Sequence, residues 1–455
     1  MYKSGREIGR EEYQDDGDTL VSRISLGGRN GVVRTSRSSR TVEVEEGPNK
    51  VHRDIPAGTV ALENGDWQAY AIAAEWCADA HEPRPVQVLV PGQGAVVEGT
   101  IVVANGAGGR RNLTLTMGAL IVTVAIDAEG RVIEARVPAQ AVEVRPPGGT
   151  PPTDTGSPPR AALPAGVAAR VIEVQEDGGK IAGEIWTPKA VRDAAPLAVI
   201  IPGSGPTDRD GNSTMGLHTD AYRQIAAALA ERGIATLRYD KRGIGASRGY
   251  REDGITLTST VRDLIALVRE AQASASFSSV TLVGHSEGGV VALEAIADVH
   301  PAALVLLATP GRNLGAVLRE QLIKSGVPAA EIDEALVETR KGSTVSSQRR
   351  ELNAVFRPSV LPFLRSMVDV DPARLLGDIK VPTTIVQGDS DRQVTLEDAE
   401  RLHAARPDAR LIVIRDMNHV LKTDRSQKSP QPSYTDPAVP LASAVIDAIA
   451  DASRR

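Results

Sequence analysis

The chain is poor in cysteine, in aromatic residues and in long apolar runs, and each shortage excludes a class of protein. Cys77 is the only cysteine, so an intrachain disulfide is excluded, and the lack of Cys and His ligand spacing argues against a metal site. No apolar run approaches the length of a membrane-spanning helix, and the N-terminal segment lacks the apolar core of a signal peptide. The sequence therefore predicts a soluble protein, cytoplasmic as the chain is written and exported if a signal peptide was removed.

The chain also lacks an excess of positive charge. The formal net charge is −6, and the lysines and arginines are scattered rather than clustered on one predicted element. A nucleic acid partner is therefore not expected. With 455 residues, of which 41% are apolar, the chain is nevertheless long enough for two or more domains with cores of their own.

A segment rich in proline and glycine, residues 146–166, divides the chain and is interpreted as an extended linker. Before it, residues 1–145 contain short β-branched segments that predict a smaller β-rich domain, either an antiparallel sheet or a small barrel, with a helical pattern only at 57–79. After it, strand and helix patterns alternate over 167–455, which favours a mostly parallel α/β sheet covered by helices on both faces. Residues 314–380 interrupt this alternation with a polar helical pattern, and their position predicts a helical cap.

The most informative motif is Gly-His-Ser-Glu-Gly288, which joins an apolar run directly to a helical pattern. Such a nucleophile elbow exposes the serine hydroxyl, here that of Ser286, and it requires small residues at Gly284 and Gly288. The segment Gly-Ala-Ser-Arg-Gly249 has the same spacing but is neither preceded directly by a strand nor followed by a helix. Ser247 is therefore interpreted as a loop residue.

A glycine-rich segment, residues 202–212, follows the predicted strand 197–201. Ligands of an open α/β sheet bind at the carboxyl ends of its strands, and a glycine-rich loop there can turn backbone N–H groups toward an anion. The N–H of Ser204 is the predicted first oxyanion donor, with Gly205 as the open alternative, and the N–H of Glu287 is the second. A phosphate loop is not favoured, because no Gly-Lys-Ser/Thr follows.

Two further strand ends carry the acid and the base of a predicted catalytic triad. Asp389 and Asp391 follow the strand expected at 383–386; Asp391 is chosen as the acid, with Asp389 as the weaker candidate. His419 follows the last predicted strand and lies downstream of both partners. The chain order Ser286, Asp391, His419 is that of nucleophile, acid and base in one large class of open-sheet hydrolases.

The other histidines are weighed against His419, because a lone histidine is more often structural than catalytic. His285 lies inside the elbow, where its ring is expected to pack, and His218 could line the pocket. His419 would take the proton of Ser286 as the serine attacks an acyl carbonyl. Asp391 would steady the imidazolium, and water would then hydrolyse the acyl-enzyme.

Four motifs together resemble the α/β-hydrolase superfamily over residues 167–455: Gly-His-Ser-Glu-Gly-Gly289, Tyr-Asp-Lys-Arg-Gly-Ile-Gly-Ala-Ser247, Gly-Asp-Ser-Asp-Arg-Gln-Val394 and Asn-His419. Residues 202–212 and 356–363 resemble, more narrowly, a bacterial esterase group often called serine aminopeptidase-like. The resemblance implies a helical cap and the triad of Ser286, Asp391 and His419. Pro202 stands where a histidine is often found, so the choice between Ser204 and Gly205 stays open.

These observations predict a serine hydrolase that cleaves carboxylic esters of small to medium acyl chains, with no cofactor and no metal. The expected partner is a small-molecule ester. A serine aminopeptidase is an alternative, because Glu287, Asp208 and Asp210 could capture a free α-amine, and a thioesterase is another. A hypothesis from a different class is a binding protein in which the hydrolase fold is inert.

Overall fold

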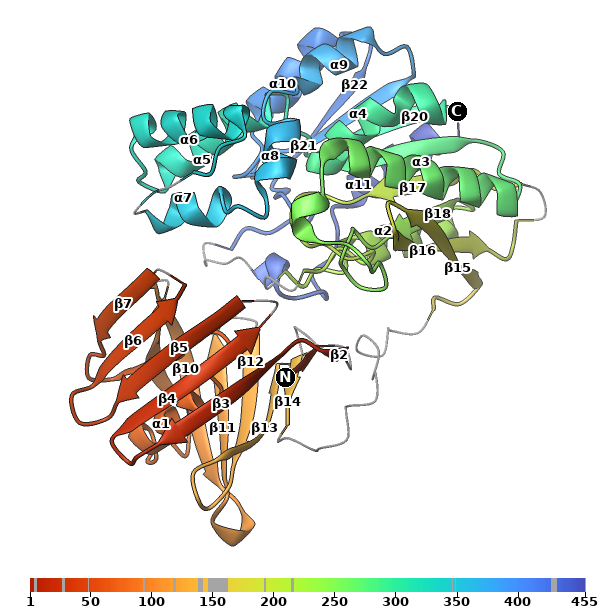
Figure 1. The fold of residues 1–455 in the computed structure, drawn as a ribbon. Helices are drawn as coiled ribbons and strands as arrows, with labels where there is room; N and C mark the ends of the chain where they lie inside the picture. The colour runs from red at the N-terminus through yellow and green to blue at the C-terminus, as the bar shows by residue number, and fades with distance from the viewer. Residues whose placement is uncertain are drawn as a thin grey trace. The chain divides into compact units, whose positions relative to one another are not determined.

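A computed structural model describes residues 1–3, 6–26, 29–47, 49–92, 95–117, 120–137, 142–145, 163–191, 194–213, 217–345, 347, 349–426 and 432–454 (Figure 1). The chain divides into two compact units, Met1–Ala161 and Ala162–Arg455. Most of the predicted linker, residues 146–162, lies outside the described residues.

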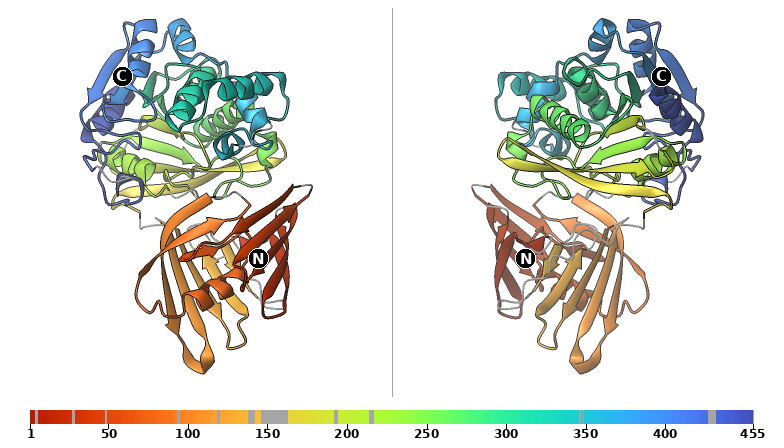
Figure 2. Two further views of the ribbon diagram at one scale, coloured as in Figure 1. Left: turned by 90° about the vertical axis from the view of Figure 1, so that its left-hand side faces the viewer. Right: turned by 90° about the vertical axis from the view of Figure 1, so that its right-hand side faces the viewer.

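The described strands of the first unit form two sheets. One has the order β3-β4-β5-β6-β7 and the other the order β2-β1-β14-β13-β12-β11-β10-β9-β8. Neighbouring strands are antiparallel except β8 and β9. The predicted β-rich unit is confirmed, as two sheets that face each other rather than as one sheet or a small barrel (Figure 2). The elements are β1 Tyr2–Lys3, β2 Arg6–Glu7, β3 Gly9–Asp15, β4 Thr19–Leu26, β5 Arg29–Ser36, β6 Thr41–Glu46, β7 Asn49–Asp54, β8 Thr59–Ala61, α1 Ala69–Trp76, β9 Arg84–Val90, β10 Ala95–Asn105, η1 Ala107–Gly109, β11 Arg111–Met117, β12 Leu120–Ile126, β13 Val132–Val137 and β14 Val142–Val144.

The core of the first unit contains side chains from both sheets and from α1. In β4 alternate residues such as Leu20 and Ile24 are buried, as expected for a strand with one face on the core. Only the later part of the predicted helical range 57–79 forms α1. Gly58 and Gly65 have φ of +76° and +91°, which end the regular backbone on either side of β8 before the helix begins.

The second unit is built on a sheet of order β15-β16-β18-β17-β19-β20-β21-β22. The first two pairings are antiparallel, and all later ones are parallel. The strands expected at 197–201 and 383–386 are both present, as β17 and β21. The strands are β15 Val167–Glu176, β16 Gly179–Pro188, β17 Leu197–Ile201, β18 Ala235–Tyr239, β19 Val280–His285, β20 Ala303–Leu307, β21 Thr383–Gly388 and β22 Arg410–Ile414.

Helices cover both faces of this sheet, which explains why its central strands are apolar without alternation. In β17, Leu197 and Val199 face one core, which α3, α4, α9 and α10 cover, whereas Ala198 and Ile200 face the other, which α2 and α11 cover. The predicted fold class, a mostly parallel α/β sheet, is confirmed. These helices are α2 Ala221–Glu231, α3 Leu257–Ser274, α4 Glu287–Val299, α9 Pro372–Asp378, α10 Leu396–Ala405 and α11 Ser443–Ser453; short 3-10 turns lie at η3 Glu252–Gly254 and η4 Pro432–Tyr434.

The insertion at 314–380 is helical, as its pattern predicts. Its first four helices enclose a small core of their own, which includes Leu336 and Phe356, and α5 and α6 lie side by side (Figures 1 and 2). The last helix, α9, instead buries Leu376 in the main core. The first four are α5 Leu314–Lys324, α6 Ala329–Lys341, α7 Arg350–Val355 and α8 Leu361–Met367. No helix in the described part of the chain is long and apolar enough to span a membrane.

Candidate active site

Ser286 occupies a strained turn between β19 and α4. Its φ of +54° and ψ of −122° lie outside the regions that L-residues favour. The turn requires glycine on both sides of the serine, because the backbones pass too closely for a side chain: a Cβ on Gly284 would lie 2.5 Å from the carbonyl oxygen of Gly288, and a Cβ on Gly288 would lie 2.2 Å from that of Ile201. The geometry is therefore that of a nucleophile elbow.

The glycine-rich loop after β17 passes next to Ser286. A Cβ on Gly203 would lie 3.2 Å from the Cβ of Ser286. Ser204 follows directly and is exposed, and Gly205 is exposed with φ of +80°. On the other side of the serine, Glu287 is the first residue of α4, so its N–H has no partner within the helix. Of the two predicted oxyanion donors, Glu287 therefore adjoins the serine directly, and Ser204 follows Gly203, which packs against the serine.

Asp391 and His419 are joined by a hydrogen bond. The Nδ1 of His419 lies 2.8 Å from Oδ2 of Asp391, and both side chains are buried. The other carboxylate oxygen accepts the backbone N–H groups of Gln393 and Val394 at 2.8 and 3.0 Å. Burial alone would raise the pKa of Asp391, but the charge of His419 and these hydrogen bonds outweigh it and lower the pKa below its usual value. The carboxylate therefore stays ionised and orients the imidazole.

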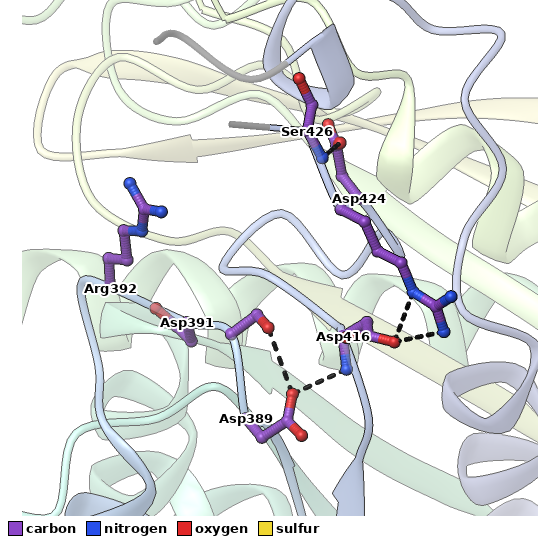
Figure 3. A pocket seen from close by; sticks show the side chains of 8 residues that line it. Asp389, Asp391, Arg392, Asp416, Asp424 and Ser426 are labelled. Carbon is purple, nitrogen blue, oxygen red and sulfur yellow. Dashed lines mark hydrogen bonds and ion pairs between the residues drawn. The ribbon is translucent and has the colours of Figure 1, made fainter. Parts of the chain in front are cut away.

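Asp389, the weaker candidate acid, binds groups other than His419. It is exposed, and its Oδ1 accepts the backbone N–H of Asp416 at 2.7 Å and the hydroxyl of Ser390 at 3.2 Å (Figure 3). It lines a polar cavity of about 430 Å³ together with Asp391, Arg392, Asp424 and neighbouring residues. Ser286 and His419 do not line that cavity.

Ser286 and His419 both lie at the carboxyl edge of the parallel strands. Among the described residues, no hydrogen bond joins Ser286 Oγ to the His419 ring. Such contacts commonly tighten only when substrate binds. The structure thus brings Asp391 and His419 together and holds Ser286 at the same edge of the sheet, at the end of β19.

The His285 ring, which is expected from the sequence only to pack, also forms hydrogen bonds through both of its nitrogens. The ring is buried, with Nδ1 2.8 Å from the hydroxyl of Tyr222 and Nε2 2.8 Å from the backbone carbonyl oxygen of His419. The Tyr222 hydroxyl in turn accepts the N–H of Gly203 at 3.1 Å. The sequence contains no signal for this chain of contacts, because Tyr222 lies on a helix far from the elbow along the chain.

The two remaining candidates, Ser247 and His218, differ in their burial. Ser247 Oγ donates to the backbone carbonyl of Asp240 at 2.7 Å and accepts the N–H of Ala182 at 2.9 Å, and its residue is 1% exposed. This serine is therefore an interior loop residue, as interpreted from the sequence. His218 is exposed, and its backbone N–H donates to Tyr434.

The three carboxylates considered for amine capture have partners. Glu287 Oε1 lies 2.9 Å from the Nζ of Lys241, and Asp210 forms an ion pair with the buried guanidinium of Arg238. Asp208 accepts the backbone N–H groups at 210 and 212, and burial raises its pKa to about 6. In the described residues no group of three or more His, Cys, Asp and Glu could hold a metal ion.

The sheet order and the elbow at Ser286 are those of an α/β hydrolase, and the candidate acid and base follow β21 and β22. The chain belongs to the α/β-hydrolase superfamily. Residues 213–426 match the serine aminopeptidase S33 family.

Three known proteins illustrate the similarity. Esterase EstD of Thermotoga maritima is 27% identical over 258 residues, which are 54% of this chain but only 60% of EstD. The putative carbamate hydrolase RutD of Escherichia coli is 23% identical over 242 residues, 50% of this chain and 83% of RutD. Est1E of Butyrivibrio proteoclasticus, solved with ferulic acid, is 20% identical with a TM-score of 0.42, covering 62% of this chain and 96% of Est1E.

Proposed function

We propose that the protein is a serine hydrolase that cleaves carboxylic esters of small to medium acyl chains. The observation that carries this proposal is the buried hydrogen bond of 2.8 Å between Asp391 and His419, at the sheet edge where Ser286 occupies its strained turn. An imidazole held in this way serves as a general base for a serine hydroxyl.

The acylation step uses the nitrogen of His419 that Asp391 leaves open. Because Nδ1 donates to Asp391, Nε2 accepts the proton of Ser286 as Oγ attacks the acyl carbon. The new O–C bond displaces the carbonyl π electrons onto oxygen, and the N–H groups of Ser204 and Glu287 stabilise that oxyanion. When the tetrahedral intermediate collapses, the bond to the alkoxy group breaks and the alcohol leaves with the proton from His419.

Deacylation repeats these steps with water. His419 takes a proton from water as its oxygen attacks the acyl-enzyme, and the same N–H groups stabilise the second oxyanion. The ester bond to Ser286 then breaks, and the serine oxygen regains its proton from His419. The products are an alcohol and a carboxylic acid, and no cofactor or metal takes part.

An aminopeptidase is the second candidate, because the S33 family carries that description. The partners of the acidic residues favour the esterase. Capture of an α-amine requires an available carboxylate, and Glu287 and Asp210 already form ion pairs with Lys241 and Arg238. Asp208 accepts two backbone N–H groups in its own loop.

The relatives also support cleavage of an ester. EstD is named as an esterase, while RutD is named as a putative carbamate hydrolase. Both names are consistent with attack on an acyl carbon. A thioesterase would use the same steps with a thiolate leaving group. A binding protein with an inert fold would have no need of an ionised, buried Asp391 paired with His419.

We also propose the domain organisation expected from the sequence: a β-rich domain at 1–145, a linker at 146–166 and a hydrolase domain at 167–455, with a cap within 314–380. Separate hydrophobic cores in the two units support the division. The small core shared by α5 to α8 supports a cap that is distinct from the sheet.

The proposed function is tested first by labelling with a fluorophosphonate probe, which reacts with activated serines. Wild-type protein and Ser247→Ala should be labelled, and Ser286→Ala should not. Active protein is then given p-nitrophenyl esters of increasing acyl length and aminoacyl p-nitroanilides. Faster turnover of the anilides than of the esters would favour an aminopeptidase over an esterase. Absence of label from the wild-type protein would favour a binding protein with an inert fold.

A further inference from the structure

Lys241 connects the two segments that supply the proposed oxyanion donors. It lies two residues after β18, at the carboxyl edge of the sheet, and its side chain is only 16% exposed. Its Nζ lies 2.9 Å from the carbonyl oxygen of Gly203 and 2.9 Å from Oε1 of Glu287. One ammonium group thus holds the loop after β17 and the start of α4 at once.

The backbone that carries Lys241 is itself fixed. Asp240 is 1% exposed and accepts Arg209 through both carboxylate oxygens, at 3.1 and 2.6 Å. Its backbone carbonyl accepts the hydroxyl of Ser247 at 2.7 Å. The ammonium of Lys241 therefore projects from a rigid base, which is what a residue that holds another group in place requires.

The contact with Gly203 determines where the N–H of Ser204 points. The carbonyl of Gly203 and the N–H of Ser204 belong to one planar trans peptide, so they point in opposite directions. The N–H of Gly203, in the preceding peptide, is already held by the hydroxyl of Tyr222. Because glycine permits many backbone conformations, without Lys241 nothing described on the carbonyl side would hold this peptide plane.

The contact with Glu287 neutralises a negative charge next to the reacting serine. Glu287 is the residue after Ser286, and its side chain is 7% exposed. An unpaired carboxylate there would repel the negative charge that develops on the acyl oxygen, and poor solvation would make that repulsion strong. The ammonium of Lys241 compensates this charge.

From these two contacts we propose that Lys241 is a positioning residue of the oxyanion hole. It orients the Gly203–Ser204 peptide through the Gly203 carbonyl, and it neutralises Glu287 next to the nucleophile. This inference rests on the proposed hydrolase function. Lys241 touches neither substrate nor the reacting atoms in this role, and its effect reaches the reaction through Ser204 and Glu287.

The test compares Lys241→Met and Lys241→Arg with wild type in hydrolysis of a p-nitrophenyl ester. Since the oxyanion forms only in the transition state, Lys241→Met should lower kcat by about 10- to 100-fold, short of the roughly 10²- to 10³-fold loss for a deleted donor, and leave KM within about threefold. Lys241→Arg, which keeps a cation with several N–H donors, should recover most of kcat. The rate of labelling by the fluorophosphonate should fall in parallel with kcat.

A matched control is Lys180→Met, which breaks a more exposed Lys–Glu contact of 2.7 Å with Glu173 in the β15–β16 hairpin. It should leave kcat unchanged. Thermal unfolding of each variant, followed by circular dichroism, identifies loss of folding. An equal kcat for Lys241→Met and wild type, or a loss of kcat matched by Lys180→Met, would overturn the proposal.

A double-mutant comparison separates the two effects of Lys241. In a Glu287→Gln background no unpaired carboxylate remains, so Lys241→Met should lower kcat less than in wild type, but still by several-fold. If Lys241→Met has no effect on kcat in that background, Lys241 acts through charge alone, and the proposal that it orients the Gly203–Ser204 peptide is refuted.

A wild type that neither hydrolyses esters nor accepts the label would refute the proposed function itself, whereas an active wild type with an equally active Lys241→Met would refute only this inference.

Discussion

His285 and His419 are joined through a hydrogen bond of 2.8 Å between the Nε2 of His285 and the backbone carbonyl oxygen of His419. A carbonyl oxygen can only accept, so Nε2 of His285 carries the proton and Nδ1 is the acceptor. Nδ1 therefore accepts the hydroxyl proton of Tyr222, whose oxygen accepts the N–H of Gly203. One chain of buried hydrogen bonds, all running in the same direction, joins the glycine-rich loop after β17, the turn at Ser286 and the loop that carries His419.

That chain requires His285 to stay neutral. Burial, with the nearby charge of His419, lowers the pKa of His285 to about 3. The ring therefore remains uncharged at any pH where His419 could act as a base. The two histidines differ in role because their environments differ: His419 faces a carboxylate, whereas His285 faces a hydroxyl and a carbonyl.

Tyr222→Phe should weaken both folding and catalysis. The change leaves the N–H of Gly203 and the Nδ1 of His285 buried without a partner, which should lower the free energy of unfolding by about 1–3 kcal/mol. Because the N–H of Gly203 loses its partner next to the proposed donor Ser204, kcat should fall as well. Chemical denaturation and ester hydrolysis measure the two effects.

Tyr250→Phe is the control for this prediction. The Tyr250 hydroxyl also donates a single hydrogen bond, to the carbonyl of Glu176 at 2.9 Å, but it lies outside the chain of contacts at the site. Loss of the Tyr250 hydroxyl should lower the free energy of unfolding by less than Tyr222→Phe does, and it should leave kcat as in wild type. Equal kcat values for Tyr222→Phe and Tyr250→Phe would show that the buried chain has no part in orienting the site.

Asp391→Asn should reduce kcat by about 10⁴-fold with little change in KM, because an amide nitrogen facing His419 would favour the wrong imidazole tautomer. Steady-state kinetics with a p-nitrophenyl ester gives both constants. Asp389→Asn is the matched control, since that carboxylate is exposed and binds the N–H of Asp416 instead. A larger loss for Asp389→Asn than for Asp391→Asn would reverse the choice of acid.

The strand ends of the second unit could be predicted because each marker residue follows its strand directly in the sequence. Ser286 comes one residue after β19 ends, and Asp391 three residues after β21 ends. Parallel strands bring their carboxyl ends to one edge, so sequence order is enough to gather these residues. The fold class followed from the same alternation of strand and helix.

The contacts of His285 and Lys241 could not be predicted in this way. Lys241 meets Gly203 and Glu287 across separations of 38 and 46 residues, and the contacts depend on side-chain directions that no periodicity encodes. In the first unit, β3 and β7 could not be predicted for a different reason. They consist mainly of polar residues and lack the alternating apolar pattern that identifies a strand.

Ser286→Ala and His419→Ala should each lower turnover by roughly 10⁴- to 10⁶-fold, and the double variant should be only slightly worse than either. The reason is that the proton of Ser286 has no acceptor without His419, and His419 has no proton to accept without Ser286. Single-turnover hydrolysis with high enzyme concentration measures such slow rates. Losses that multiply in the double variant would mean that the two side chains act independently and do not form a triad.

Glu11 and Asp66 should make the first unit less stable as pH rises. Glu11 accepts the backbone N–H groups of Trp67 and Gln68, while Asp66 accepts the hydroxyl of Ser22 at 2.8 Å. Burial first, and then the charge of Asp66, raises the pKa of Glu11 well above its usual value; burial also raises that of Asp66. The folded unit therefore holds a proton that the unfolded chain has released.

The sign follows from that difference in protonation. Stability is fully present below the ordinary carboxyl pKa of about 4 and is lost as pH rises toward the raised pKa of the folded unit. Hydrogen exchange of peptides from β3 and α1 should therefore be faster at pH 8 than at pH 5, after correction for the intrinsic pH dependence of exchange. Glu11→Gln, which keeps the shape but cannot ionise, should remove most of this difference. The same dependence in Glu11→Gln as in wild type would mean that other groups of the first unit govern its response to pH.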